Sequence, residues 1–246
     1  MLSDLSHGNA LDKDFEFRIS CFGFKHWRTN MIMILIVLAF VLLVGLLIFE
    51  KGENRKGMLP TKTALSLLFI ITAVSQIHLI QPYTLFIIIG LLFCLGGDVF
   101  LALPQDRMFL FGLVSFLLGH ICYVIGFIWI AGPSNMTLIG VIVTLVLSGL
   151  VYTWLKPHLG TMKKPVIAYI LVISFMFISA WSVLGMPRQP FMARLLVFAG
   201  AACFYISDIF VARDKFLKSS FINRLLGLPL YYLAQFMIAF SIGMVR

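Results

Sequence analysis

Long apolar runs follow one another along the chain, and short polar or proline-containing stretches interrupt them. Each run approaches the roughly 20 apolar residues that an α-helix needs to cross the hydrocarbon core of a membrane. The pattern predicts eight transmembrane helices, at about 31–49, 63–80, 84–103, 109–130, 136–155, 165–186, 191–212 and 225–244. The interruptions are 50–60, 81–82, 104–107, 132–133, 156–164, 187–190 and 213–224. The predicted fold is therefore an all-α membrane protein, a bundle of about eight transmembrane helices.

The first 30 residues differ from the rest because they are polar and mixed in charge. They lack the basic start, short apolar core and small-residue cleavage site of a signal peptide. Residues 15–27 mix aromatic and basic side chains, a composition suited to the membrane interface. We expect two regions, a polar or interfacial tail over 1–30 and an eight-helix transmembrane domain over 31–246.

Composition supports a lipid-facing protein. The hydrophobic fraction is 61% and the charged fraction only 12%, against about 25% charged residues in an ordinary soluble domain. The net charge of +9 comes from basic residues between the apolar runs, which suits contact with anionic lipid headgroups rather than nucleic acid. We therefore expect an integral, multi-pass protein, placed in the inner membrane of a bacterium or the endoplasmic reticulum of a eukaryote, with membrane lipids but no nucleic acid among its partners.

Cysteine usage predicts neither a disulfide framework nor a zinc site. The four cysteines are Cys21, Cys94, Cys122 and Cys203, and the last three lie inside apolar runs with no CxxC or Cys/His cluster. We expect them to be reduced core residues.

Basic residues are unevenly shared between the two ends of the predicted bundle. The connections after the first, third, fifth and seventh runs carry twelve of them, whereas those after the second, fourth and sixth carry only Arg188 and the helix-edge Arg194. The positive-inside rule places the first set in the cytoplasm. The basic residues that precede the first run oppose this orientation.

An internal repeat links the third and seventh runs. One ends in Gly97-Asp98-Val99-Phe100-Leu101-Ala102 and the other in Ser207-Asp208-Ile209-Phe210-Val211-Ala212. Because the two runs are four helices apart, a duplicated four-helix unit in parallel orientation would explain the match. Chance is the alternative, since short apolar–Asp–apolar matches are common.

Polar side chains are rare inside the apolar runs, and each needs a reason because a charged group there costs about 2.5–3.5 kcal/mol on insertion scales. The set comprises Lys62, Asp98, His120, Tyr123, Tyr169, Asp208, Tyr231, Tyr232 and Gln235. Helices alternate in direction, so Lys62, Asp98, Tyr169, Asp208 and Tyr231 fall in the same half of the membrane. His120 and Gln235 lie roughly 15 Å in, at 1.5 Å per residue. We predict one pocket that opens towards the odd-numbered connections.

Two carboxylates in different surroundings can divide the roles of acid and base. A pocket half in lipid fits a substrate with a long tail and a small polar head, whose phosphate Lys62 would contact. The alternatives are structural: Asp98 and Asp208 paired with Lys62, Arg213 or Lys215, His120 as a hydrogen-bonded core residue, and Gln235 as a tie between helices. An Asp98–Asp208–His120 metal site is a further alternative, although more ligands of that kind are missing.

Taken in order, the motifs resemble one family. They are Thr61-Lys62; Gly90-Leu91-Leu92-Phe93 through Gly97-Asp98-Val99-Phe100-Leu101; Phe116-Leu117-Leu118-Gly119-His120-Ile121-x-Tyr123; Pro165-Val166-x-x-Tyr169; Gly200-Ala201 through Phe204-x-x-Ser207-Asp208; and Tyr231-Tyr232-Leu233-Ala234-Gln235. The chain resembles the YhhN-like lysoplasmalogenase family of eight-span membrane proteins from about residue 60 to its end. Thr63 departs from the pattern, because the family often has proline there.

The resemblance implies an enzyme that cleaves the vinyl ether bond of lysoplasmalogens to a fatty aldehyde and a glycerophospho-ethanolamine or -choline, without a metal or organic cofactor. It suggests Asp98 as acid and Asp208 as base or stabiliser, with the two roles interchangeable, and His120 as a third catalytic residue that tunes either one. Substrate-binding roles would go to Lys62, Tyr123, Tyr169, Tyr231, Tyr232 and Gln235. A lipid or small-solute transporter, or a non-catalytic lysolipid-binding protein, remains the alternative.

Overall fold

The computed structural model describes residues 30–246, and these residues form helices joined by short connections, with no strand among them. The predicted all-α fold is confirmed. The predicted tail over 1–30 lies outside the described residues except for its last position. Two compact units make up the chain, Met1–Val41 and Leu42–Arg246. The fold and site described below belong to the second unit.

Eight long helices occupy the described part of the chain. They are Asn30–Lys51, α2 (Arg55–Ser75), α3 (Pro82–Ala102), α4 (Asp106–Ile130), α5 (Asn135–Leu155), α6 (Lys163–Leu184), α7 (Phe191–Phe216) and α8 (Phe221–Ser241), with short 3₁₀ turns at Lys156–His158 and Gly160–Met162. Seven of the eight are long and apolar enough to cross a membrane. Helix α8 is as long as α2, and both bury polar side chains.

Helix α2 begins and ends earlier than the apolar pattern predicts. The sequence indicated 63–80, whereas the helix spans Arg55–Ser75. The side chain of Asn54 accepts a hydrogen bond from the Gly57 amide and caps the first turn, where such a cap satisfies a free donor. Pro60 lies inside the helix, so the predicted interruption over 50–60 is much shorter. As a result Lys62 stands well inside α2 and not at its start.

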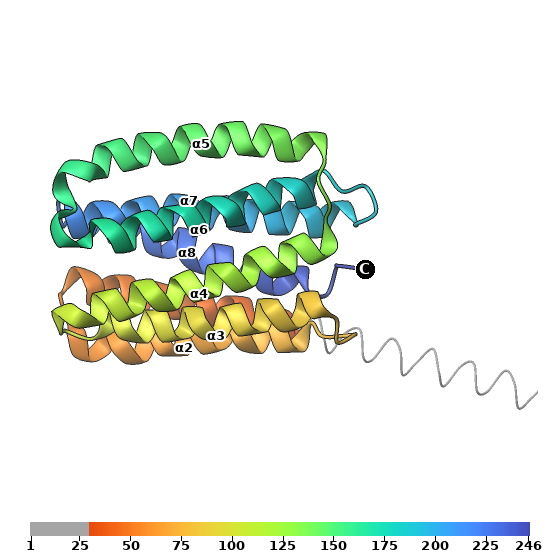
Figure 1. The fold of residues 1–246 in the computed structure, drawn as a ribbon. Coiled ribbons are helices and arrows are strands. Elements are labelled where there is room, and N and C mark those ends of the chain that lie inside the picture. Colours follow the sequence, from red (N-terminus) through yellow and green to blue (C-terminus); the bar gives the residue numbers. More distant parts are fainter. Residues whose placement is uncertain (1–29) are drawn as a thin grey trace, which may run out of the picture. The chain divides into compact units, whose positions relative to one another are not determined.

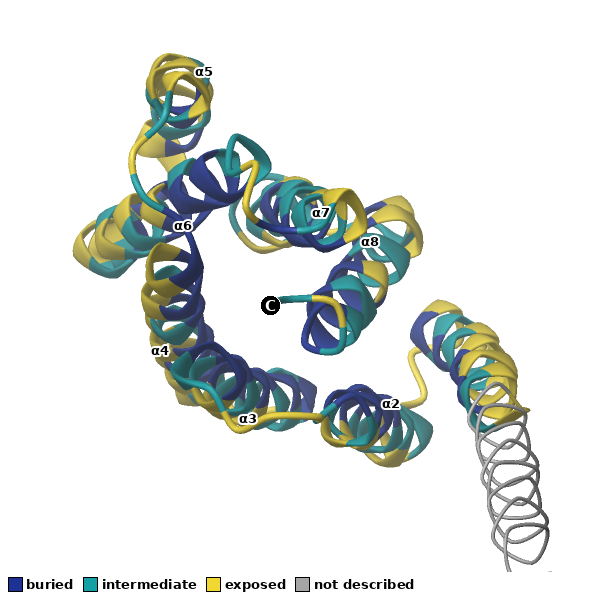
Figure 2. Cartoon of the chain, turned by 90° about the vertical axis from the view of Figure 1, so that its right-hand side faces the viewer, coloured by how far each residue is buried: buried dark blue, intermediate teal, exposed yellow. Residues whose placement is uncertain are grey.

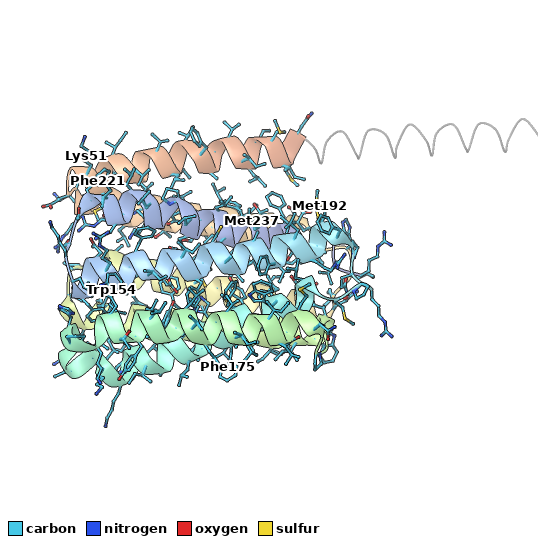
Figure 3. All side chains as sticks on the ribbon, turned by 90° about the horizontal axis from the view of Figure 1, so that it is seen from above. Lys51, Trp154, Phe175, Met192, Phe221 and Met237 are labelled. Carbon is cyan, nitrogen blue, oxygen red and sulfur yellow. The ribbon has the colours of Figure 1, made fainter. Side chains whose placement is uncertain are left out.

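Six helices pack in a closed ring in the order α2, α3, α4, α6, α7 and α8, and α8 returns to pack on α2. Helix α5 lies outside this ring against α6 (Figure 2). The helices α2–α8 run alongside one another (Figure 1), so successive connections fall at opposite ends. Lys51, Trp154 and Phe221 mark the end with the odd-numbered connections, and Met192 lies towards the other end (Figure 3).

The burial pattern is that of a membrane protein. Buried residues face the interior of the ring and exposed ones face outward (Figure 2). The outward side chains are mostly large and apolar: Ile142 and Leu145 on α5 and Phe175 on α6 are each more than 60% exposed. A soluble protein would not present so much contiguous apolar surface to water. These side chains therefore face lipid.

Small residues allow two helix pairs to approach closely. A Cβ added to Gly90 on α3 would lie 3.1 Å from the Gly119 carbonyl on α4 and closer still to the Tyr123 ring. A Cβ added to Gly200 on α7 would lie 3.2 Å from the Ala234 carbonyl on α8. Close backbone approach of this kind is how helices associate in membranes, where apolar burial gives no driving force.

The same contacts agree with the predicted duplication. Packing of α3 on α4 corresponds to α7 on α8, α2 on α3 to α6 on α7, and α4 on α6 to α8 on α2. Gly200 follows Gly90 by 110 residues, the interval that also separates Asp98 from Asp208. The order of packing is the one that the predicted duplication requires, with one aspartate in each three-helix half.

Candidate active site

A cavity of about 710 Å³ opens among the helix ends at the odd-numbered connections. Its wall includes the five polar residues that the sequence placed in one half of the membrane, Lys62, Asp98, Tyr169, Asp208 and Tyr231. The structure thus brings these five residues together on one cavity wall. Apolar side chains from α3 to α7 line the rest, among them Leu113, Phe116 and Ile173. One space therefore combines a polar wall with room for an apolar chain.

Asp98 accepts two short hydrogen bonds at one carboxylate oxygen. The Ser66 hydroxyl on α2 and the Tyr231 hydroxyl on α8 both donate to Oδ2, each at 2.6 Å. The Lys62 ammonium also acts on this carboxylate electrostatically. Asp98 is only 3% exposed, and no described residue donates to Oδ1. Donors and a nearby cation all favour a charged carboxylate at this position.

Asp208 has fewer partners. The Tyr169 hydroxyl on α6 donates to its Oδ2 at 2.6 Å, and no other hydrogen bond to the carboxyl group is made by the described residues. Its Oδ1 is therefore free of protein donors, and the residue lines the cavity. A carboxyl group with a single donor holds a proton more readily than one with two donors and a nearby ammonium group.

The two halves differ at one pair of corresponding positions. Phe116 lies three residues before Gly119, and Tyr231 lies three residues before Ala234. The backbone carbonyls of Gly119 and Ala234 are the ones that face the close-packing glycines of α3 and α7. They occupy equivalent places on α4 and α8, and their rings meet with centroids 5.7 Å apart. Tyr231 gives a hydroxyl to the aspartate of the opposite half, whereas Phe116 has no hydroxyl.

Four predicted site residues form a buried layer away from the cavity wall. Tyr123 donates to Oε1 of Gln235 at 2.7 Å and lies 3.7 Å from the Cys94 sulfur. Tyr232 is 2% exposed, and its ring packs on Tyr231. Gln235 is fully buried, and none of the side chains of Tyr123, Tyr232 and Gln235 lines the cavity.

His120 is the fourth residue of this layer, and it is completely buried. Its ring lies edge-on to Phe204, at 4.5 Å between centroids, and to Tyr169, at 5.4 Å. It interacts with the Phe116 carbonyl one turn earlier, but neither ring nitrogen makes a hydrogen bond of good geometry within the described residues. A direct catalytic role for His120 stays a prediction, and its position is that of a support for Tyr169.

Three polar residues of the site escaped the sequence analysis. Ser66 stands one turn after Lys62 on the same face of α2, so helical periodicity could have found it. Glu50 and Arg224 were assigned to interruptions between runs, yet Glu50 lies 3.3 Å from Lys62 and 3.6 Å from Arg224 at the cavity wall. No sequence signal joins these two, because 174 residues separate them.

The metal-site alternative finds no support in the geometry. Across residues 30–246, no three His, Cys, Asp or Glu side chains lie close enough together to hold an ion. Asp98, Asp208 and His120 therefore do not form a ligand set. The two aspartates instead accept hydrogen bonds from hydroxyl groups at Oδ2, and no described residue donates to Oδ1 of either.

Comparison with known proteins gives the family. The sequence matches the YhhN family over residues 57–242, which include every residue of the site except Glu50. The chain belongs to the YhhN family. Lysoplasmalogenase TMEM86A of Bos taurus is 32% identical over 165 residues, covering 66% of this chain and 67% of the relative. A lysoplasmalogenase of Mycobacterium bovis is 29% identical over 189 residues, covering 74% of this chain and 69% of the relative.

These matches confirm the predicted family and the prediction that the chain is an enzyme. Together with the membrane-length helices they make it an integral, multi-pass membrane protein. The human lysoplasmalogenase TMEM86A gives a similar match, at 33% identity over 165 residues. No solved structure matches the chain.

Proposed function

We propose that this chain hydrolyses the vinyl ether bond of lysoplasmalogens, releasing a fatty aldehyde and a glycerophospho-ethanolamine or -choline. The observation that carries the proposal is a pair of aspartates in unequal surroundings on one cavity wall. The names of the relatives, from mammals and mycobacteria, support the same substrate class.

The cavity suits such a substrate in size and character. Its volume of about 710 Å³ is within the range of sites for small organic ligands, roughly 300–1,000 Å³. Phe116, Leu113 and Ile173 offer an apolar surface for the hydrocarbon tail. The carboxyl groups and tyrosine hydroxyls lie where the glycerol end and the vinyl ether would enter from the membrane interface.

The chemistry needs a proton donor and a stabilising anion. A protonated carboxyl group donates its proton to the vinyl carbon that is not bonded to oxygen, which leaves an oxocarbenium ion at the other carbon. The second carboxylate stabilises this cation electrostatically and takes a proton from the water that attacks it. The resulting hemiacetal then collapses to the aldehyde and the glycerol hydroxyl.

The hydrogen bonds favour Asp208 as the acid and Asp98 as the anion. Two hydroxyl donors and the nearby Lys62 ammonium favour charge on Asp98, whereas Asp208 has the single donor Tyr169. The family resemblance suggested Asp98 as the acid and Asp208 as the base or stabiliser, and allowed the two roles to be exchanged. The proposed assignment is the exchanged one. Two carboxyl groups whose surroundings differ are a recurring way to run acid and base chemistry at one pH.

The remaining predicted residues take positioning roles in this proposal. Tyr169 and Tyr231 orient the two carboxyl groups through their hydrogen bonds. His120 packs behind Tyr169 and restrains its ring. Tyr123 and Gln235 tie α4 to α8 beneath the cavity, and Tyr232 packs on Tyr231.

Aldehyde release by the purified chain in detergent tests the proposal. Lysoplasmalogen should yield fatty aldehyde, and the saturated 1-alkyl ether should yield none, because only the vinyl ether can be protonated to an oxocarbenium ion. In D₂O the aldehyde should carry one deuterium at C2, delivered by the acid. Absence of aldehyde from folded protein across detergents and pH would refute the proposal and favour a carrier or binding protein.

A further inference from the structure

Charged side chains from four helices, the helix Asn30–Lys51 and helices α2, α7 and α8, meet at the cavity wall. Glu50, at the end of the helix Asn30–Lys51, is only 3% exposed and lies 3.3 Å from Lys62 Nζ and 3.6 Å from Arg224 Nη1. The Arg224 Nε lies 3.3 Å from the carboxylate of Asp214. All four residues line the cavity, and none of them belongs to the pair of carboxyl groups that would do the chemistry.

Stability alone is a weak reason for this arrangement. Taking charges out of water costs several kcal/mol per ion, so a buried ion pair often contributes little net stability. Charged groups near the hydrocarbon region are therefore functional candidates by default. Here the anion of Glu50 bridges two cations that come from separate elements, α2 and α8.

Arg224 is held in place without Glu50. Asp214 accepts hydrogen bonds from the Ser220 amide at 2.8 Å, from Asn223 at 3.1 Å and from Arg224 at 3.3 Å. These bonds fix the Nε side of the guanidinium and leave Nη1 directed to Glu50. Lys62 is 8% exposed on α2, and its ammonium is paired with Glu50. The carboxylate of Glu50 thus lies between two cations, where an anionic group of a ligand could take its place.

The spacing matches a lysophospholipid. Lys62 precedes Ser66 by one helical turn, about 6 Å along α2, and Ser66 bonds the carboxylate of Asp98. In a lysoplasmalogen six bonds separate the vinyl carbon next to oxygen from the phosphorus atom, roughly 7 Å in an extended glycerol at ordinary bond lengths. A substrate with its vinyl ether at Asp98 and Asp208 would place its phosphate near Lys62.

We propose that Lys62 and Arg224 bind the phosphate diester of the substrate, and that Glu50 occupies this site in the empty enzyme and is displaced when substrate enters. The assignment of a lysophospholipid rests on the proposed function. Lys62 supplies a compact ammonium and Arg224 a planar fork, the two side chains that proteins use for phosphate. Glu50 then acts as an internal competitor of the substrate phosphate for the two cations.

Binding of non-hydrolysable ligands by the purified full-length chain tests the assignment. The probes are a saturated 1-alkyl lysophosphoethanolamine and the corresponding 1-alkyl glycerol, which lacks phosphate. Lys62→Met should weaken binding of the phospholipid at least about tenfold, the loss expected for one charge-assisted contact, and leave the alkyl glycerol unchanged. Lys62→Arg should keep most of the affinity. Lys164→Gln is the charge control, because Lys164 is an exposed lysine near the start of α6. It should change the binding of neither ligand.

The competitor role makes an opposite prediction for Glu50. Glu50→Gln should tighten phospholipid binding several-fold and leave the alkyl glycerol unchanged. Its melting temperature without ligand should fall, because Lys62 loses its ion-pair partner and Arg224 loses one of two, and the phospholipid should restore it. If this variant does not fold, Glu50→Asp, which draws the carboxylate back by one methylene, should change affinity in the same direction.

Three results would overturn the proposal. One is an equal loss of affinity for both ligands in Lys62→Met, which would make the role of Lys62 structural. Another is unchanged or weaker phospholipid binding in the Glu50 variants. The third is displacement of the phospholipid by inorganic phosphate as effectively as by glycerophosphoethanolamine, which would assign the site to a free anion. Phosphate-dependent binding without any aldehyde release would refute the hydrolase and leave the phosphate site standing.

Discussion

Removing the Tyr231 hydroxyl should separate the roles of the two aspartates. Tyr231→Phe deletes one of the two 2.6 Å hydrogen bonds on Asp98 and leaves the Ser66 bond, the ring and its packing against Phe116 in place. A hydrogen bond to a charged group contributes about 1.5–3 kcal/mol. If Asp98 is the anion that stabilises the oxocarbenium ion, kcat/KM should fall by roughly 10- to 150-fold at 1.36 kcal/mol per tenfold.

The assay is fatty aldehyde release from lysoplasmalogen by the purified variant, with melting temperature and elution volume as checks on folding. Tyr152→Phe is the matched control, since Tyr152 packs on the Leu155–Leu159–Val166 cluster and does not line the cavity. That control should keep wild-type kinetics. Activity of Tyr231→Phe within about twofold of wild type, in folded protein, would refute the reasoning about Asp98.

Further predictions follow from the same contacts. Phe116→Tyr should slow turnover about tenfold or more, because a new hydroxyl donor near Asp208 would favour its charged form; a faster variant in the aldehyde assay would contradict this. Ser66→Ala should lower kcat/KM about tenfold with little change in melting temperature, and an unchanged rate would show that the Tyr231 bond alone suffices. Gly90→Ala should destabilise the chain by about 1–3 kcal/mol through overpacking, seen as a lower melting temperature, whereas Gly149→Ala, with open space around its Cβ, should not; equal melting curves would count against close packing of α3 on α4.

The helices and their direction were open to prediction because lipid enforces a simple pattern. Each span must be apolar and satisfy its own backbone, so length and composition reveal it. Alternation then placed Lys62, Asp98 and Tyr231 at the same end, and all three line one cavity in the structure. The boundaries of α2 were less predictable, because the Asn54 cap and the tolerated Pro60 lie outside the apolar run.

The partners of each site residue were not predictable. The hydrogen bonds from Tyr231 to Asp98 and from Tyr169 to Asp208 join side chains that are 133 and 39 residues apart in the sequence. Their existence depends on the closure of the ring, which apolar periodicity does not specify. Without these partners, the sequence could not decide which aspartate is the acid and which is the base.

Polar residues near helix ends were the hardest to interpret. Glu50 was grouped with the interruption after the first run, since a glutamate beside Lys51 and Gly52 ordinarily faces water. In the structure its carboxylate is buried between Lys62 and Arg224. An ion pair between the first and last parts of a chain leaves no local pattern in the sequence.

The most direct test of the account is aldehyde release by wild type, Asp98→Asn and Asp208→Asn from lysoplasmalogen, with the saturated ether as negative control. The account predicts release by wild type from the vinyl ether only, and a loss of about 10²–10⁴-fold in each variant, the usual contribution of general acid–base groups, in chains that still insert and elute as wild type. Near-normal turnover in both folded variants would contradict catalysis by these two carboxyl groups.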